Sequence, residues 1–209
     1  MGRTKTIDDE RILARARAVF RAGGHAASTR DVARAAGISQ AVLYQRFGSK
    51  AELFLRAMTP DPPDLESLLG PYPPRNARAD LERIGQRLAV YLGALIPTLL
   101  HVVAHPGLRR ERLARWHEEL PFRPLLMALT DRFERLRDDG LVSGVDPAAA
   151  ARAFLATVHS AALFETLTRD GPPRAPHGPQ AHREQVDALI EVLWAGLAPA
   201  GPVRSRRRR

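Results

Sequence analysis

The chain has no cysteine among its 209 residues. This absence excludes a disulfide framework, thiolate metal sites and cysteine catalysis, and it leaves the redox compartment undecided. Sustained alternation of apolar and polar residues is also missing, and no internal repeat is present. Because such alternation is the main sequence signal of a β-strand, the sequence predicts an all-α fold.

Long apolar runs are absent too. The best candidate, Leu88–Ala104, contains Pro97 and His101 and continues a helical pattern, whereas a membrane-spanning helix needs about 20 consecutive apolar residues. The first residues lack a basic segment followed by an apolar run, so we expect no secretory signal. These absences favour a soluble cytoplasmic protein without a membrane partner.

Signatures of catalysis are missing as well. The chain has no nucleophile elbow, no glycine loop that cradles phosphate, no metal triad and no paired carboxylates. His101 and His105 have the i,i+4 spacing that lets two imidazoles share one metal ion, but no acidic third ligand accompanies them and Pro106 follows directly. We therefore expect no enzyme, no cofactor and no metal site.

The charge that is present is unevenly distributed. The net charge is +9, and residues 1–58 carry eleven Lys and Arg against five Asp and Glu. Residues 59–203 carry sixteen against eighteen, and residues 204–209 add five arginines. A basic segment joined to a nearly neutral body indicates one part that faces a polyanion and another with a different task. The alternative is a basic surface that only keeps the protein soluble.

Apolar residues recur every three or four positions along most of the chain, the pattern of amphipathic helices. Six prolines interrupt this pattern between residues 59 and 74. We therefore expect a head at 1–58, a proline-rich connection at 59–79, a helical body at 80–198 and a disordered basic tail at 199–209. Outside the segment 28–58, helices are expected at 8–21, 81–99 (with a kink or a new start at Pro97), 108–119, 125–137, 146–169 and 180–197.

Residues 28–50 carry the most informative pattern. Ser28 and Asp31 form a capping box at the start of a short helix, and Gly37 tolerates the left-handed conformation that ends it. Ser39 caps a second short helix, and Ser49 with Glu52 marks a third start. Two short helices around a four-residue turn form a helix-turn-helix.

The second of these helices presents side chains suited to a DNA groove. Amides and a guanidinium can read base edges, a methyl can touch thymine, and a tyrosine hydroxyl can reach phosphate. Lys50 lies at the N-terminus of the next helix, where backbone amides also favour a phosphate oxygen. Each of these residues alone could belong to an ordinary solvated surface, but such a surface does not explain the whole set. The outward-facing residues of the second helix are Gln40, Ala41, Tyr44, Gln45 and Arg46.

The segment from Thr29 to Phe54, preceded by a helix that ends at Phe20-Arg21 before Gly23-Gly24, resembles the tetracycline-repressor (TetR) family. The shared positions include Asp31-Val32-Ala33, Ala36-Gly37-Ile38-Ser39, Leu43-Tyr44, Phe47, Ser49-Lys50 and Leu53-Phe54. The resemblance covers about residues 8–58. It implies a homodimer with nine or ten helices per subunit, and a C-terminal pocket whose ligand changes the spacing of the two heads, usually relieving repression.

Carried over to this sequence, the resemblance implies phosphate contacts by Thr29, Tyr44 and Lys50. It implies recognition-helix roles for Gln40, Ala41, Gln45 and Arg46, with Arg30 contacting a base or phosphate and Ser39 beside them. Many family members have lysine or arginine in place of Gln40 and histidine in place of Arg46. These departures leave DNA binding intact but give no operator sequence.

The C-terminal half gives weaker signals. The resemblance places the dimer interface on the helices near 146–169 and 180–197, and small residues such as Ala149, Ala153 and Ser160 favour close helix approach. Such a dimer would bind double-stranded DNA with a pseudo-palindromic operator. The arginine tail would add salt-sensitive, sequence-independent affinity.

A pocket for a small apolar or aromatic effector is expected between the helices of 81–137 and 146–169. Aromatic, Met and a few polar side chains suit such a pocket, although each of them suits a helical core equally well. The candidates are Tyr91, Leu95, Thr98, His101, Trp116, Phe122, Met127, Phe133, His159 and Phe164.

Together these features predict a ligand-responsive DNA-binding transcriptional regulator, a repressor released from its operator by the effector. The alternative is a DNA-binding architectural protein, or an activator, without a small-molecule effector. An enzyme that carries a helix-turn-helix head is disfavoured because no catalytic signature accompanies the motif.

Overall fold

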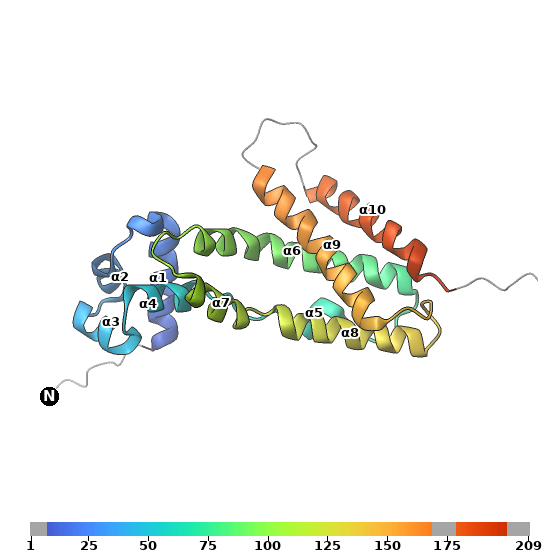
Figure 1. The fold of residues 1–209 in the computed structure, drawn as a ribbon, viewed down its shortest axis with the longest axis horizontal. Coiled ribbons are helices and arrows are strands. Elements are labelled where there is room, and N and C mark those ends of the chain that lie inside the picture. The colour runs from blue at the N-terminus through green and yellow to red at the C-terminus, as the bar shows by residue number, and fades with distance from the viewer. Residues whose placement is uncertain (1–7, 169–178, 200–209) are drawn as a thin grey trace, which may run out of the picture. The chain divides into compact units, whose positions relative to one another are not determined.

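The computed structural model describes residues 8–168 and 179–199. Within those residues the chain forms ten α-helices, one short 3-10 helix (η1) and no strand, so the all-α prediction is confirmed. The helices are α1 (Asp9–Gly23), η1 (Gly24–Ala26), α2 (Thr29–Ala36), α3 (Gln40–Phe47), α4 (Lys50–Met58), α5 (Leu65–Leu69), α6 (Ala77–Val103), α7 (Arg110–Glu118), α8 (Phe122–Asp138), α9 (Pro147–Thr168) and α10 (Pro179–Leu197) (Figure 1). The predicted tail lies outside the described residues from position 200 onward.

The helices group into two compact units. The first contains the chain up to Asp61 together with Pro97–Leu120, and the second contains Pro62–Ile96 together with the chain from Pro121 onward. Helix α6 therefore contributes residues to both units. The four-part division drawn from the sequence stays a prediction.

Helices α1 to α4 of the first unit share one small core. Helix α1 buries Ile12, Ala16 and Phe20, and the Phe20 ring meets the edge of Phe54 from α4 at a centroid distance of 5.1 Å. Leu43 from α3 is also fully buried. Helices of eight residues are unstable alone in water, so this shared core is what holds α2 and α3 in place.

Residues 97–120 complete the first unit. Arg21 donates a hydrogen bond of 3.0 Å to Oγ1 of Thr98, and Nε1 of Trp116 donates one of 2.9 Å to Oγ1 of Thr59. The Phe54 ring lies 4.6 Å from the His105 ring and 6.0 Å from the His101 ring. His101 thus packs against the head's core.

The second unit is built on the apolar stripe of α6. Leu81, Ile84, Leu88 and Leu92 are fully or almost fully buried. Helix α6 is the only described helix long and apolar enough to cross a membrane by length and composition, but this buried stripe makes it a core helix. It is longer than the predicted helix, and Pro97, expected to kink it or to begin a new one, lies inside it.

Helices α8, α9 and α10 complete this unit. Phe133 of α8 and Phe154 of α9 pack edge to face at 6.0 Å, and α9 runs beside α10 (Figure 1). The oxygens of Asp146 accept backbone hydrogen bonds from Ala148 and Ala149 and so cap the start of α9, next to the helix start at 146 that the sequence predicts.

The segment after α5 is pinned by one buried arginine. Arg132 of α8 is 4% exposed and donates to the carbonyls of Leu69, Gly70 and Pro71 at 2.6, 2.8 and 3.2 Å. It also pairs with the fully buried Asp80 at 3.7 Å. Burial raises the pKa of Asp80 and lowers the pKa of Arg132, because each charge has left water.

Tyr72 extends this arrangement. Its ring lies beneath the Arg132 and Arg135 guanidinium groups, and its hydroxyl donates to Asp139. Burial and the acceptor carboxylate together raise the pKa of Tyr72 to about 12. Residues 59–79, predicted only as a connection, therefore contain a short helix and fixed side-chain contacts.

Candidate functional site

The helix-turn-helix has the local geometry that its caps predict. Oγ of Ser28 accepts the backbone N–H of Asp31 at 3.2 Å, and the Asp31 carboxylate accepts the Ser28 N–H and O–H at 3.3 and 2.6 Å. These hydrogen bonds lower the pKa of Asp31. Gly37 ends α2 with φ +69°, in the left-handed region. The predicted capping box and turn glycine are confirmed.

The next two helices begin as expected. Oγ of Ser39 accepts the N–H of Val42 at 3.2 Å, and Oγ of Ser49 accepts the N–H of Glu52 at 3.1 Å. Ser39 is exposed beside the start of α3, but its hydroxyl is engaged in this cap. Lys50 is the first residue of α4 and is half-buried.

Three of the predicted DNA-contacting side chains meet in one hydrogen-bonded cluster. Nε2 of Gln40 donates to Oγ1 of Thr29 at 3.0 Å, and Oη of Tyr44 lies 3.0 Å from the same oxygen. Thr29 is 6% exposed, whereas Tyr44 is 43% exposed. The cluster ties the first turn of α2 to the first two turns of α3.

The remaining candidates differ in their surroundings. Arg30, Ala41 and Gln45 are exposed. Arg46 forms an ion pair of 2.9 Å with Asp9 in the first turn of α1. The two residues are 37 positions apart on different helices, so no local pattern signals this contact.

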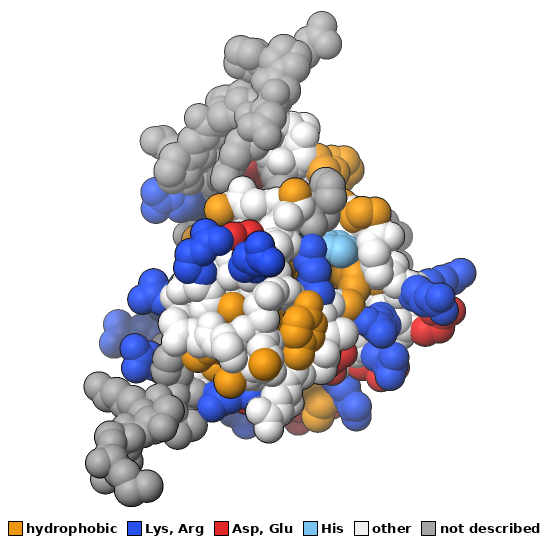
Figure 2. Space-filling view, turned by 90° about the vertical axis from the view of Figure 1, so that its left-hand side faces the viewer, with side chains coloured by type: hydrophobic (Ala, Val, Ile, Leu, Met, Phe, Trp, Pro, Cys, Tyr) orange, Lys and Arg blue, Asp and Glu red, His pale blue; other side chains and the backbone are white. Residues whose placement is uncertain are grey.

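Charge is unevenly distributed over the face of the molecule that Figure 2 shows. Figure 2 shows Lys and Arg side chains around the margin of one face and mainly uncharged side chains at its centre. This distribution suits a nucleic acid, because phosphates flank the base edges that a protein reads.

The comparisons with known proteins agree with this geometry. Residues 12–57 match the model of the bacterial regulatory proteins of the tetR family. These residues therefore form the DNA-binding head of a TetR-family transcriptional regulator. This family is non-enzymatic, and its helix-turn-helix binds DNA. No curated protein matches the sequence.

Solved structures of regulators resemble about nine-tenths of the chain. A TetR-family regulator from Mesorhizobium loti is 22% identical, with a TM-score of 0.71 over 91% of this chain and 96% of that one. The flavonoid-responsive regulator FrrA is 22% identical, with a TM-score of 0.65 over 92% and 97%. FadR from Bacillus subtilis, solved with stearoyl-CoA, is 13% identical, with a TM-score of 0.58 over 90% and 99%. At these identities the likeness shows the fold.

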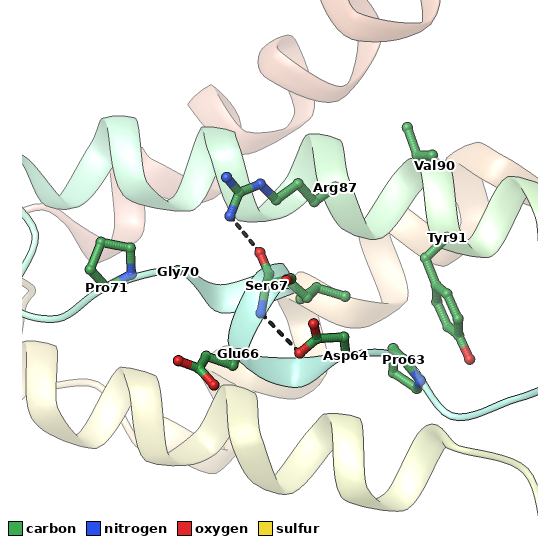
Figure 3. Close-up of a pocket in the computed structure, with 10 residues that line it drawn as sticks. Pro63, Asp64, Glu66, Ser67, Gly70, Pro71, Arg87, Val90 and Tyr91 are labelled. Atoms are coloured by element: carbon green, nitrogen blue, oxygen red, sulfur yellow. Dashed lines mark hydrogen bonds between the residues drawn. The ribbon is translucent and has the colours of Figure 1, made fainter.

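A large pocket of the second unit lies between residues 63–71, which contain α5 and are called the α5 segment, and helix α6 (Figure 3). It has a volume of about 930 Å³ and is open to solvent. Arg87 donates to the Ser67 carbonyl at 2.6 Å, and the Ser67 N–H donates to Asp64 at 3.1 Å. The lining residues are Pro63, Asp64, Glu66, Ser67, Leu68, Gly70, Pro71, Arg87, Val90 and Tyr91.

Among the sequence candidates for an effector pocket, this lining includes Tyr91 alone. Leu95, Thr98, Trp116 and Phe133 are buried, whereas Met127 and Phe164 are 60% and 65% exposed. Phe122 and His159 are half-buried and pack edge to face at 5.9 Å, and burial lowers the pKa of His159. The effector role of these residues stays a prediction.

His101 and His105, considered as metal ligands from their spacing, both lie beside Phe54. In the described part of the chain, no group of three or more His, Asp or Glu side chains is placed to hold a metal ion.

Proposed function

We propose that this regulator is a cytoplasmic homodimeric repressor that leaves a pseudo-palindromic operator when a small apolar or aromatic molecule binds. The capped helix-turn-helix with its exposed polar face carries the proposal, because it supplies both a rigid scaffold and groups that can read DNA. In this assignment, residues 1–58 bind DNA and residues 80–198 dimerise, while the effector binds between the connection at 59–79 and helix α6.

Helix α3 enters the major groove in this proposal. Gln40, Ala41, Gln45 and Arg46 face base edges, and Tyr44 and Lys50 contact phosphate. Arg30, exposed at the second position of α2, contacts a base or a phosphate. The exposure of Ala41, Tyr44 and Gln45 supports this orientation.

The DNA model is tested by replacing Tyr44 and Lys50 together with alanine. The probe is the duplex that the wild-type protein enriches from a randomised library. We expect weaker binding to all sequences and a salt slope smaller by about 1, because one cationic phosphate contact is lost. In contrast, Gln45→Ala should change sequence preference. Unchanged affinity of the double variant for the enriched duplex would contradict the model.

The pocket of Figure 3 is our proposed effector site. Its volume of about 930 Å³ suits a small molecule, and apolar side chains such as Pro63, Leu68 and Val90 line it. FrrA is flavonoid-responsive and FadR was solved with stearoyl-CoA, so a flavonoid panel and long-chain acyl-CoAs are suitable first probes.

A matched pair of variants tests this site. Val90 lines the pocket and is 73% exposed, while Val103 on the same helix is 63% exposed and is not among its lining residues. Val90→Trp should abolish release of the enriched duplex by the active compound while leaving DNA affinity unchanged. The Val103→Trp variant should still release the enriched duplex when the active compound is added. Release that survives Val90→Trp would place the effector elsewhere.

Helices α9 and α10 are the proposed dimer interface. They expose large apolar side chains, Phe164, Leu167 and Val192, at 65%, 60% and 74%. Small side chains such as Ala156 and Ser160 line a shallow groove beside Phe164. An exposed apolar surface of this kind supports association with a second copy.

A further inference from the structure

The hydroxyl of Thr29 is hydrogen-bonded to other side chains of the same protein. Thr29 is the first residue of α2 and is 6% exposed. Its Oγ1 accepts from Nε2 of Gln40 and lies 3.0 Å from Oη of Tyr44. The family resemblance implies a phosphate contact for Thr29, but the side chains of α3 already engage its oxygen.

The chemistry of a hydroxyl limits how these three groups share protons. The Thr29 hydroxyl offers one O–H donor and two lone pairs that can accept hydrogen bonds. With one lone pair engaged by Gln40, Thr29 can donate its proton to Oη of Tyr44. The phenolic proton of Tyr44 is then available for an outside acceptor such as a phosphate oxygen. The bond also leaves Oε1 and one N–H of Gln40 for a base edge.

We propose that Thr29 is a positioning residue for DNA recognition. Its hydroxyl fixes the Gln40 amide and the Tyr44 hydroxyl before DNA arrives, and it does not bind phosphate itself. Side chains ordered in advance lose less freedom on binding, and two such side chains are worth about tenfold in affinity. This inference rests on the proposed reading of DNA by α3.

The test is a set of variants at Thr29, each made in two backgrounds. Thr29→Val keeps the shape and removes the hydroxyl, and Thr29→Ser keeps the hydroxyl. The backgrounds are the wild type and a Gln40→Ala, Tyr44→Phe double variant. Binding is measured to the duplex enriched by the wild-type protein, with thermal unfolding as the control for folding.

We expect Thr29→Val to weaken binding about tenfold in the wild-type background, with relaxed preference at the base that Gln40 reads, and Thr29→Ser to restore both. In the double-variant background Thr29→Val should change affinity less than about twofold, because its partners are gone. Equal losses in the two backgrounds would establish a direct DNA contact and overturn the proposal. No loss in either background would also overturn it.

Side-chain amide relaxation by NMR tests the same idea in the free protein, independently of whether Thr29→Val folds. Gln45 on the same helix is exposed and serves as the internal control. The Gln40 amide should be more ordered than that of Gln45, and equal order would contradict the proposal. If the wild-type protein enriches no sequence, the proposed function fails. If it does and Thr29→Val binds normally, only the positioning role fails.

Discussion

At the scale of single residues, polar groups around α3 are tied to other elements. The Arg46–Asp9 pair joins the last turn of α3 to the first turn of α1, and its side chains are 26% and 44% exposed. Partly exposed ion pairs contribute roughly 0–1 kcal/mol. The main effects of the pair are therefore to orient the Arg46 side chain and to offset its charge. Its contribution to the free energy of unfolding is small.

His159 provides a residue-scale test by pH. Burial lowers its pKa below the ordinary value of 6.5, so the unfolded chain binds a proton more readily than the folded one. This residue's contribution to the free energy of unfolding is therefore fully present above about pH 6.5 and is lost as pH falls through the lowered pKa.

Urea unfolding of the wild type and of His159→Gln measures this effect. Between about pH 7.5 and about pH 5.5, the wild type should lose more unfolding free energy than the variant. The other histidines are common to both proteins and cancel in the comparison. An equal or steeper loss in His159→Gln would show that burial of His159 does not control its titration.

At the scale of elements, two glycines of α6 differ in their neighbours. A Cβ at Gly85 would lie 2.3 Å from Cδ1 of Ile190 and 3.4 Å from Cγ1 of Val186, both on α10. A Cβ at Gly93 would meet nothing within 4 Å. Gly85 therefore permits close packing of α6 on α10, whereas Gly93 only weakens the helix.

Gly93→Ala should raise the free energy of unfolding by about 1 kcal/mol, the usual gain in helix propensity. Gly85→Ala adds the same propensity, but it forces the buried Ile190 side chain to move, which costs about 1–3 kcal/mol. We expect the unfolding free energy of Gly85→Ala to lie below that of Gly93→Ala by about that amount. Equal stabilities in urea titrations would show that α10 shifts to accommodate the added Cβ at little cost in free energy.

Elements with local signals were predictable from the sequence. Caps at Ser28, Ser39 and Ser49 act within three residues, and all three are confirmed. Helix α5 was missed because five residues between prolines show no periodicity. The segment at the end of α5 is held by hydrogen bonds from Arg132, which lies more than sixty residues later in the sequence.

The candidate site divides in the same way. Its residue types and their spacing on α3 could be identified from the sequence, but the contacts of Thr29 with Gln40 and Tyr44 join residues 11 and 15 positions apart on different helices. The pocket of Figure 3 was not foreseen, because its walls come from the α5 segment and two turns of α6. Contacts of this kind depend on tertiary packing.

At the scale of the whole molecule, the proposed dimer is directly testable. Light scattering after gel filtration should give about twice the chain mass of 23.1 kDa at micromolar concentration. Phe164→Arg should shift the protein toward the monomer and weaken binding to the enriched duplex, because a charge would be buried in the interface. Val103→Arg is the control, since Val103 is similarly exposed but lies outside α9 and α10. A monomeric wild type would contradict the proposal.

The Arg132 contacts have a consequence for redesigning this regulator as a biosensor. They fix the backbone at Leu69–Pro71, and a side chain at Gly70, which has φ +71°, would meet the Arg83 and Arg87 guanidinium groups at 3.3 and 3.2 Å. Libraries aimed at inducers that bind the proposed effector site should therefore leave these positions unchanged. Diversity belongs at Pro63, Glu66, Ser67 and Val90, which line the same cavity outside the anchored stretch.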